Sequence, residues 1–340
     1  MRRVGVYGGG LLLRALLSVV ILMSATTGIQ AQTTDDDQIF TLQFANDYFG
    51  NSDQHFTNGF RAAWMPSAKS VPQWVVDGAS YFPLFDPAGK KRVVFSLGQS
   101  IFTPDDIAAT SLLRDERPYA GWLYGGVGLV SVSDARLDNI ELNIGMVGGA
   151  SFAEDVQKTW HKWFGFQRPN GWNNQLKNEP GILLNYERKW RMRTPQKYFG
   201  VDADFTPHAG VSLGNVLTQA SVGFTVRFGG NLRKHDDYGP PRIRPSLPGS
   251  DYFVRSDGLS WYVFFGAEGR SVLRNIFLDG NTFRDSHSVN KKPFVGDIQG
   301  GIAVVMGRAR LAYTHIFRTK EFDTQDDTDQ FGSISLSFIF

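Results

Sequence analysis

Residues 45–60, ANDYFGNSDQHFTNGF, gather polar side chains between two apolar runs. Their groups are of the kinds that bind a metal ion or hold a water molecule: Asn46, Asp47, Asn51, Asp53, His55, Thr57 and Asn58. The simpler interpretation is a hairpin loop, because Asn and Asp are frequent turn formers. The choice between the two depends on the side of the fold that this loop faces.

A second group able to do chemistry is His161, within the segment 151–179. A neutral imidazole has an unperturbed pKa of about 6.5, so His161 is suited to act as a general base. The alternative is that a histidine beside two tryptophans belongs to a girdle of aromatic side chains at a membrane surface.

The segment around His161 is predicted to contain a helix. Ser151 followed by Glu154 forms a capping box, and Gly165 is placed to end the helix. One apolar stripe follows from three- and four-residue spacing: Phe152, Val156, Trp160 and Trp163. A helix with such a stripe is suited to lie at a lipid surface.

The first 31 residues are typical of a cleaved secretory signal peptide. Arg2 and Arg3 precede an apolar run that contains Arg14, and small or polar residues lead to Ala31. Removing these three arginines changes the formal net charge from +2 to −1, which leaves no basic field to attract nucleic acid. The predicted organisation is a signal peptide at 1–31 and a single domain at 32–340.

The rest of the chain has the composition of an all-β transmembrane barrel. It combines 37 glycines, 27 phenylalanines and 8 tryptophans with no cysteine, and no run of about 18 apolar residues follows the signal peptide. Apolar and polar residues alternate in GSISLSFIF, SVGFTVRF, NIELNIGM and RARLAYTHIF. A soluble sandwich alternates in the same way, but glycines and large aromatics rarely crowd together in its core. The pattern therefore favours an antiparallel up-and-down barrel with apolar residues outside and polar residues in the lumen.

About twelve strands are predicted, an even number that returns both chain ends to the periplasmic side. Their ranges are 37–46, 57–65, 92–102, 119–131, 137–150, 180–190, 198–213, 217–228, 259–271, 294–307, 309–319 and 330–340. The connections 47–56, 103–118 and 151–179 then lie at the extracellular rim, together with the polar loop and His161. The connections 66–91 and 229–258 are long for periplasmic turns.

Four motifs in this order resemble the outer-membrane lipid A 3′-O-deacylases of the LpxR type, over about residues 37 to 340. They are NDYF at 46–49, HFTNGF at 55–60, RPYAGWLY at 117–124, and TWHKWFG with GWNNQLKNEPG between 159 and 181. The resemblance implies a twelve-stranded barrel in the outer membrane of Gram-negative bacteria. It also implies a hydrolase that uses Ca²⁺ to cleave an acyl ester of lipid A, the lipid part of lipopolysaccharide in the outer leaflet.

Site residues follow from the matched positions. Asn46 and Asp47 match the Asn-Asp pair of the family and are the expected Ca²⁺ ligands, while Thr57 matches its Ser/Thr near the start of the second strand. His161 matches the catalytic histidine, so the resemblance implies a base that deprotonates water while Ca²⁺ stabilises the oxyanion. The basic residues expected to bind the lipid A phosphates are Arg114 and Arg117.

One position departs from the family pattern. Gln167 stands six residues after His161, where the deacylases have Glu. An amide would orient the imidazole more weakly than a carboxylate, and Asp155 and Glu179 are the acidic residues considered as substitutes. Two other functions therefore stay open: an outer-membrane phospholipase, and a non-catalytic barrel whose rim loops bind surface ligands.

Overall fold

The computed structural model describes residues 36–47, 55–81, 83–86, 88–194, 197, 200–232, 238–240 and 251–340, without the side chains of His55 and Ser80. The predicted signal peptide at 1–31 lies outside the described residues, and so do Asn51 and Asp53 of the polar loop.

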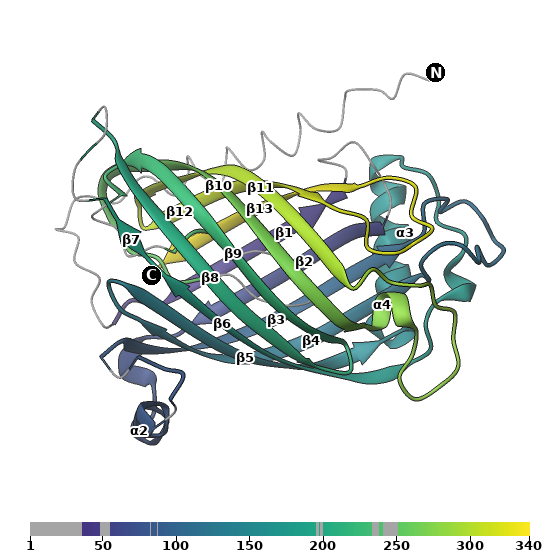
Figure 1. Ribbon diagram of the computed structural model, residues 1–340, viewed down its shortest axis with the longest axis horizontal. Coiled ribbons are helices and arrows are strands. Elements are labelled where there is room, and N and C mark those ends of the chain that lie inside the picture. Colours follow the sequence, from purple (N-terminus) through teal and green to yellow (C-terminus); the bar gives the residue numbers. More distant parts are fainter. Residues whose placement is uncertain are drawn as a thin grey trace.

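In the described part of the chain, thirteen strands run antiparallel to their neighbours in one sheet. They are β1 (Ile39–Asn46), β2 (His55–Met65), β3 (Lys90–Thr103), β4 (Ala120–Val132), β5 (Arg136–Val147), β6 (Glu179–Trp190), β7 (Met192–Arg193), β8 (Asp202–Gly214), β9 (Leu217–Gly230), β10 (Ser256–Asn275), β11 (Phe294–Gly307), β12 (Ala309–Arg318) and β13 (Asp329–Ile339). β1 pairs with β2 and with β13, and β6 pairs with β8, so the sheet closes. Because β7 is a two-residue extension beside β8, the chain is a closed barrel of twelve spanning strands (Figure 1).

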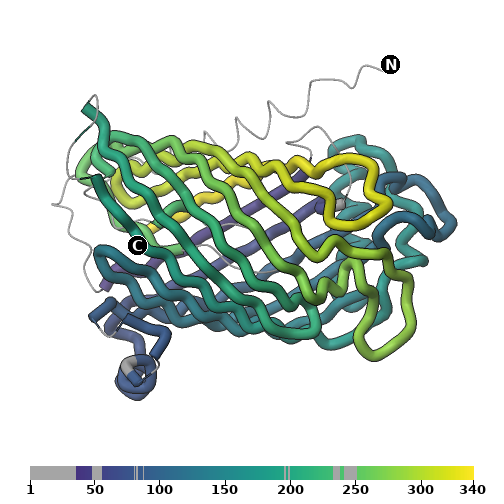
Figure 2. The backbone as a smooth tube through the Cα atoms, in the orientation of Figure 1, coloured from purple at the N-terminus to yellow at the C-terminus, as the bar shows by residue number. Residues whose placement is uncertain are grey.

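The short helices lie at the two ends of this barrel. They are α2 (Gln73–Tyr81), α3 (Ala153–Phe164) and α4 (Ile276–Asp279). α3 and α4 lie at one end with the longer connections, while α2 lies at the other end, near the C-terminus (Figures 1 and 2). Outer-membrane barrels have long connections outside the cell and short ones in the periplasm, so we refer to these two ends as extracellular and periplasmic.

The predicted strands are all present, with boundaries that differ by a few residues. The largest differences are the start of β8 at Asp202 and the end of β10 at Asn275. The long connection 66–91 contains α2, which the sequence did not predict. In the other long connection, Phe253 is fully buried, so this part of the chain packs inside the barrel.

Alternation along the strands separates an apolar outer face from a polar lumen, as predicted. On β1, Phe40 and Leu42 are exposed. On the opposite face, Thr41 and Gln43 are buried and donate hydrogen bonds to serine hydroxyls of β13. No helix in the described part of the chain has the length and apolarity needed to cross a membrane.

Ion pairs fill much of the lumen. Arg61 binds Asp251 at 2.9 Å and Glu141 at 3.4 Å, and all three side chains are buried. Nearer the extracellular end, Asp297 receives hydrogen bonds from Arg270 and Arg318. These pairs satisfy the buried charges that an apolar core would not tolerate.

Aromatic side chains close the lumen at its extracellular end, which the sequence did not predict. Phe56 lies 5.0 Å from Phe331 and 5.5 Å from Phe102, and Phe102 stacks on Phe277 of α4 at 4.1 Å. The wide spacing of these residues in the sequence gives no sign that they meet.

Replacing Arg61 by Met should destabilise the barrel by about 3–5 kcal/mol, because Asp251 and Glu141 would remain buried without their cation. The measurement is the midpoint of urea unfolding, followed by heat-modified electrophoretic mobility in detergent. The control is Arg308→Met, which removes an exposed arginine from the β11–β12 turn. Equal midpoints for the two variants would contradict this account of the lumen.

Candidate functional site

The site begins at the extracellular end of β1. Asn46 shares the outward face of the strand with Phe44, because side chains alternate along a strand. Asn46 and the following Asp47 are nevertheless 6% and 3% exposed. Asn46 Nδ2 donates a 2.6 Å hydrogen bond to the main-chain oxygen of Thr57. The outward-facing Asn46 is therefore covered by another part of the chain.

Thr57 lies at an irregularity of the barrel wall. The register between β2 and β3 shifts between Phe56 and Asn58, so Thr57 is the extra residue of a β-bulge. Its hydroxyl lies 2.7 Å from the hydroxyl of Thr103 at the end of β3. The bulge thus fixes the carbonyl that holds Asn46.

The helix predicted around His161 is present as α3, but it begins differently. The predicted capping box is wrong: the N-cap is Phe152, in the left-handed region at φ 58°, and it makes no side-chain cap. Ser151 belongs to a 3-10 turn, η3 (Gly149–Ser151), where its hydroxyl donates to the carbonyl of Gly148. The end of α3 agrees with the prediction, since Gly165 adopts φ 71° and donates its N–H to the carbonyl of His161.

α3 turns three of the four residues of its apolar stripe away from the barrel, namely Phe152, Val156 and Trp163. Phe152 is 58% exposed and Trp163 is 74% exposed. The buried stripe is instead Ala153, Gln157 and His161, at four-residue spacing toward the wall. This orientation is the reverse of a helix on a soluble protein and suits a helix whose outer side meets lipid.

Close contacts hold α3 against the outer wall. The ring of Trp160 lies 5.3 Å from that of Phe44, two residues before Asn46 on β1. At the other end of the helix, a Cβ on Gly121 of β4 would lie 2.2 Å from the Cβ of Ala153. Gln99 of β3 also donates a 2.7 Å hydrogen bond to the carbonyl of Ser151.

The segment after α3 folds back to support it. Trp172, in the 3-10 turn η4 (Trp172–Asn174), donates a 2.8 Å hydrogen bond to Gln157 of α3. Its ring lies 4.9 Å from that of Tyr119, whose hydroxyl donates to the carbonyl of Ile107. The connections 103–119 and 165–178 therefore form one block beneath α3.

His161 is 3% exposed, and a main-chain carbonyl fixes its ring. Nδ1 lies 2.5 Å from the carbonyl oxygen of Gln167. A carbonyl only accepts hydrogen bonds, so Nδ1 carries the hydrogen and the lone pair of neutral His161 is at Nε2. The main chain of residue 167 orients the imidazole, whereas the sequence directed attention to its side chain.

Glu179 and Asp155, the acidic residues considered as substitutes for a Glu at position 167, make other contacts or are exposed. Glu179 accepts hydrogen bonds from the side chain of Asn281 at 2.9 Å and from the main chain of Thr282 at 2.9 Å, so it organises the β10–β11 connection. Asp155 is exposed on α3.

The two arginines expected to bind phosphate lie in different environments. Arg114 is exposed on the β3–β4 connection. Arg117 is 1% exposed; it binds Glu321 at 3.4 Å and lies over the ring of Phe102 at 5.1 Å, on the lumen side of the rim. The structure thus does not bring Arg117 together with Asn46 and His161, and the substrate-binding role of both arginines stays a prediction.

The donor set offered by Asn46 and Asp47 consists of an amide oxygen and a carboxylate, the ligand types that Ca²⁺ prefers. Among the described residues, no three His, Asp or Glu side chains gather as a metal cluster. Any ion at this position would need further oxygen ligands, such as main-chain carbonyls, water or the substrate. The donors present fit Ca²⁺ in kind.

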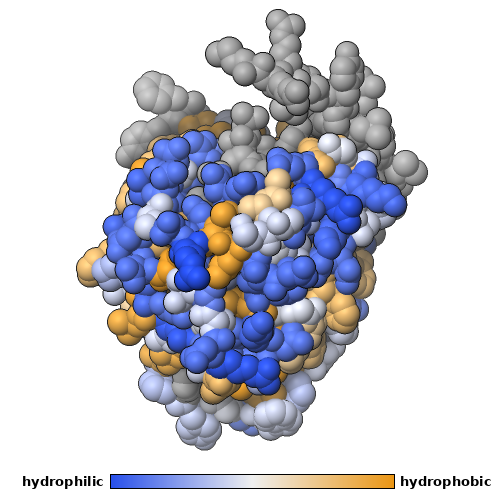
Figure 3. All heavy atoms as spheres, turned by 90° about the vertical axis from the view of Figure 1, so that its right-hand side faces the viewer, coloured by the Kyte–Doolittle hydropathy of each residue, from blue (hydrophilic) through white to orange (hydrophobic). Residues whose placement is uncertain are grey.

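Hydrophilic residues cover most of the extracellular end, with apolar residues near its middle and toward its margins (Figure 3). The connections here are bound to one another: His287 lies 2.7 Å from the carbonyl of Glu116, and Thr324 donates to the carbonyl of Asp115. The connections at this end therefore pack together as one cap. α3 lies beside this cap, on the outer face of the barrel.

Replacing Gly121 by Val should displace α3, because the new side chain would overlap Ala153. Overpacking of this kind costs about 1–3 kcal/mol. Trypsin should then cut at the exposed Lys162 about tenfold faster or more, while the heat-modified mobility of the barrel is unchanged. Gly125→Val, on the same strand as Gly121, is the control, since a Cβ there has its closest neighbour, the main-chain oxygen of Ser96, 3.9 Å away.

Acid should loosen the β12–β13 connection through Glu321. Burial disfavours the charged carboxylate, but Arg318 and Arg117 outweigh this effect and lower the pKa of Glu321 below its usual 4.5. The ion pairs therefore contribute fully above pH 4.5 and are lost as the pH falls below that value. Protection factors of residues 319–328, obtained from hydrogen exchange corrected for its intrinsic pH dependence, measure the effect between pH 7 and 3, and Glu321→Gln should remove most of their change with pH.

Known proteins resemble this chain in sequence and in fold. The family model described as "Outer membrane protein LpxR" matches residues 15–340. Among solved structures, LpxR from Salmonella typhimurium superposes with a TM-score of 0.70 at 19% identity, covering 89% of this chain and 100% of that one. The β domain of the Bordetella autotransporter BrkA gives a TM-score of 0.43 at 8% identity, covering 90% and 99% of the two chains. A search of curated proteins found no match. The chain belongs to the LpxR family of outer-membrane β-barrel proteins.

Proposed function

We propose that this chain is a Ca²⁺-assisted esterase that removes an acyl chain from lipid A in the outer leaflet, with His161 as general base. The observation that carries the proposal is the position of His161, buried between α3 and the outer wall of the barrel. A lipid in the bilayer approaches a barrel from this side. A reactive group in the lumen would not meet its ester.

The proton chemistry follows from the tautomer of His161. Water attacks the ester carbonyl and transfers a proton to Nε2. The imidazolium keeps its Nδ1 hydrogen bond to the carbonyl oxygen of Gln167, whose negative end stabilises the positive charge. The same proton then passes to the leaving alkoxide, so His161 acts as base and acid in turn.

Asn46 and Asp47 would hold Ca²⁺, which supplies positive charge for the oxyanion that develops during attack. Thr57 positions Asn46, because its carbonyl binds the Asn46 amide and its own hydroxyl is fixed by Thr103. All four residues belong to the wall at β1, β2 and β3, so the barrel supplies the rigid half of the site and α3 supplies the base.

Exposed side chains around α3 suit a lipid substrate. Phe152, Val156 and Trp163 point away from the wall and would enter the outer leaflet. Arg114, exposed on the same rim, is suited to bind a phosphate of lipid A. Arg117 holds the base of that connection through Glu321. Membership of the LpxR family supports lipid A as the lipid.

Mass spectrometry of lipid A incubated with the purified barrel tests this function. Loss of one acyl chain with Ca²⁺, and its suppression by a chelator, is expected. His161→Ala should lower the rate by about 100- to 10,000-fold. Hydrolysed phospholipid with intact lipid A would support a phospholipase instead, and no turnover of either lipid would support a non-catalytic barrel.

Substitution of Gln167 should have little effect. Because its carbonyl rather than its side chain holds His161, Gln167→Ala and Gln167→Glu should each change the rate by less than about tenfold, or ~1.4 kcal/mol. The measurement is the same lipid A assay. A hundredfold gain in Gln167→Glu would contradict the assignment of the orienting group to the main chain.

A further inference from the structure

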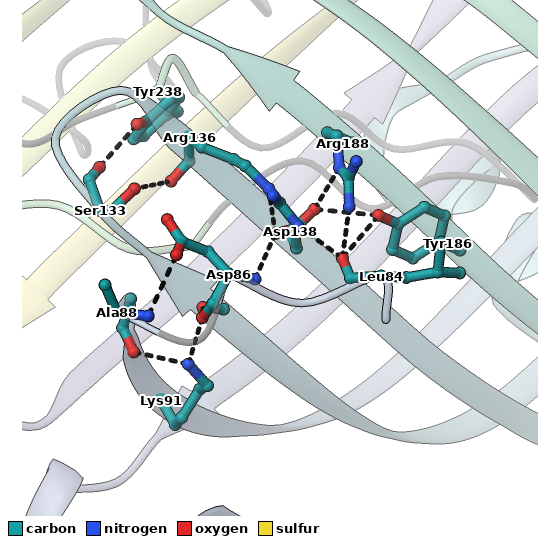
Figure 4. A network of polar contacts seen from close by, with 12 residues as sticks. Leu84, Asp86, Ala88, Lys91, Ser133, Arg136, Asp138, Tyr186, Arg188 and Tyr238 are labelled. Atoms are coloured by element: carbon teal, nitrogen blue, oxygen red, sulfur yellow. Dashed lines mark hydrogen bonds and ion pairs between the residues drawn. The ribbon is translucent and has the colours of Figure 1, made fainter. Parts of the chain in front are cut away.

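A polar cluster lies on the outside of the barrel at the periplasmic end, opposite the proposed catalytic site (Figure 4). Its centre is Asp138 of β5, whose carboxylate accepts hydrogen bonds from Arg136 at 2.6 Å and from Arg188 at 2.7 Å. By strand alternation Asp138 shares the face of Ile144, which is 55% exposed, so the carboxylate points toward the bilayer side. It is nevertheless completely buried.

The β2–β3 connection covers this carboxylate. The main-chain N–H of Asp86 donates to Asp138 at 3.1 Å. The carbonyl of Leu84 accepts from Arg136 at 2.9 Å and from Arg188 at 2.6 Å, and the hydroxyl of Tyr186 lies 2.9 Å from it (Figure 4). The connection is therefore fastened to the outer faces of β5 and β6.

The two arginines of this cluster remain partly exposed. Arg136 and Arg188 have side chains 24% and 21% exposed. Each arginine donates from Nε to the carboxylate of Asp138 and from Nη2 to the carbonyl of Leu84, so Nη1 takes no part in these two bonds. The guanidinium of Arg188 also lies 5.8 Å from the ring of Trp190. Planar cations beside an aromatic ring are suited to bind phosphate oxygens.

Apolar side chains flank the cluster. Leu84 and Trp190 are 39% and 38% exposed. On β5 and β6 the same outward face continues along the barrel with paired apolar side chains: Ile144 with Ile182, and Leu142 with Leu184. The two arginines thus lie where the lipid-facing belt ends, at the level of phospholipid head groups.

α2 extends this surface sideways. Trp74 is 76% exposed and Tyr81 is 87% exposed, and one helical face carries both, since they are seven residues apart. Figures 1 and 2 show α2 beside the periplasmic end, beyond the outline of the barrel. Trp and Tyr are the residues that concentrate at membrane interfaces.

We propose that the β2–β3 connection is a membrane-contact element that binds phospholipid of the inner leaflet, with α2 lying in the interface and Arg136 and Arg188 holding a head-group phosphate. Asp138 is a positioning residue: it aligns the two guanidinium groups and anchors Leu84. Apolar contacts of α2 and charge complementarity at the arginines then act on the same leaflet.

Site-directed spin labels test the position of α2, and the absence of cysteine from the chain makes single labels unambiguous. Labels at Trp74→Cys and Tyr81→Cys are compared in vesicles with Leu97→Cys on the lipid-facing side of β3 and Arg308→Cys in a periplasmic turn. The two α2 labels should resemble Leu97→Cys, with high accessibility to oxygen and low accessibility to a water-soluble nickel complex. Accessibility like that of Arg308→Cys at both positions would overturn the proposal.

Native mass spectrometry tests the phosphate site, with phosphatidylglycerol added to the barrel in an uncharged detergent. Arg136→Gln and Arg188→Gln should each weaken retention by about tenfold or more, the loss expected for a charge-assisted hydrogen bond. The charge-matched control is Arg168→Gln, which is exposed on the extracellular side. Equal retention by all three variants, after their heat-modified mobility has confirmed folding, would refute a specific phosphate site.

Discussion

Closure of the sheet is the constraint on which the rest of this protein depends. A bilayer offers no hydrogen-bond partners to an open strand edge, so the first strand must pair with the last. β1 and β13 meet this requirement through a continuous register that runs from Ile39 with Ile339 to Asn46 with Gly332. The β1–β13 pairing therefore ends at Asn46. Asn46, the first residue of the candidate site, is thus held in place by the pairing that closes the barrel.

Closure also decides where polar groups go. With lipid outside, the lumen must hold the charged side chains, and pairs such as Arg61 with Asp251 and Arg318 with Asp297 satisfy them. Polar residues on the outer face need a cover of their own. α3 packs on Phe44 beside Asn46 at one end, and the segment around Leu84 covers Asp138 at the other. Both ends of the barrel thus follow one rule: an outward-facing polar group is accompanied by a connection folded over the wall.

The sequence was sufficient for the barrel and insufficient for the site. Alternation has a period of two in any sheet, so GSISLSFIF already specifies which face of β13 is apolar, and repetition gives the strand number. The helix at 153–164 and its end at Gly165 were predictable from spacing and from the φ that glycine permits. The exposure of Phe152 and Trp163 agrees with the predicted lipid-facing stripe, whereas the spacing gave no sign that Trp160 packs on Phe44. The role of Gln167 could not be predicted, because every residue has a main-chain carbonyl and residue identity does not show which one binds His161. The role of Arg117 could not be predicted either, because its partner Glu321 is distant along the chain.

α3 has one further consequence for how an enzyme of this design would behave. Since the imidazole lies between the helix and the outer wall, access runs sideways from the leaflet. The rate at which enzyme and lipid substrate meet would then depend on the mole fraction of substrate in the leaflet. Adding inert lipid to that leaflet would slow the reaction although the amount of substrate in the tube is constant, and a water-soluble ester with the same head group would meet a barrier of Phe152 and Trp163. Turnover would be set by lateral diffusion and surface dilution, the kinetics of a reaction confined to two dimensions.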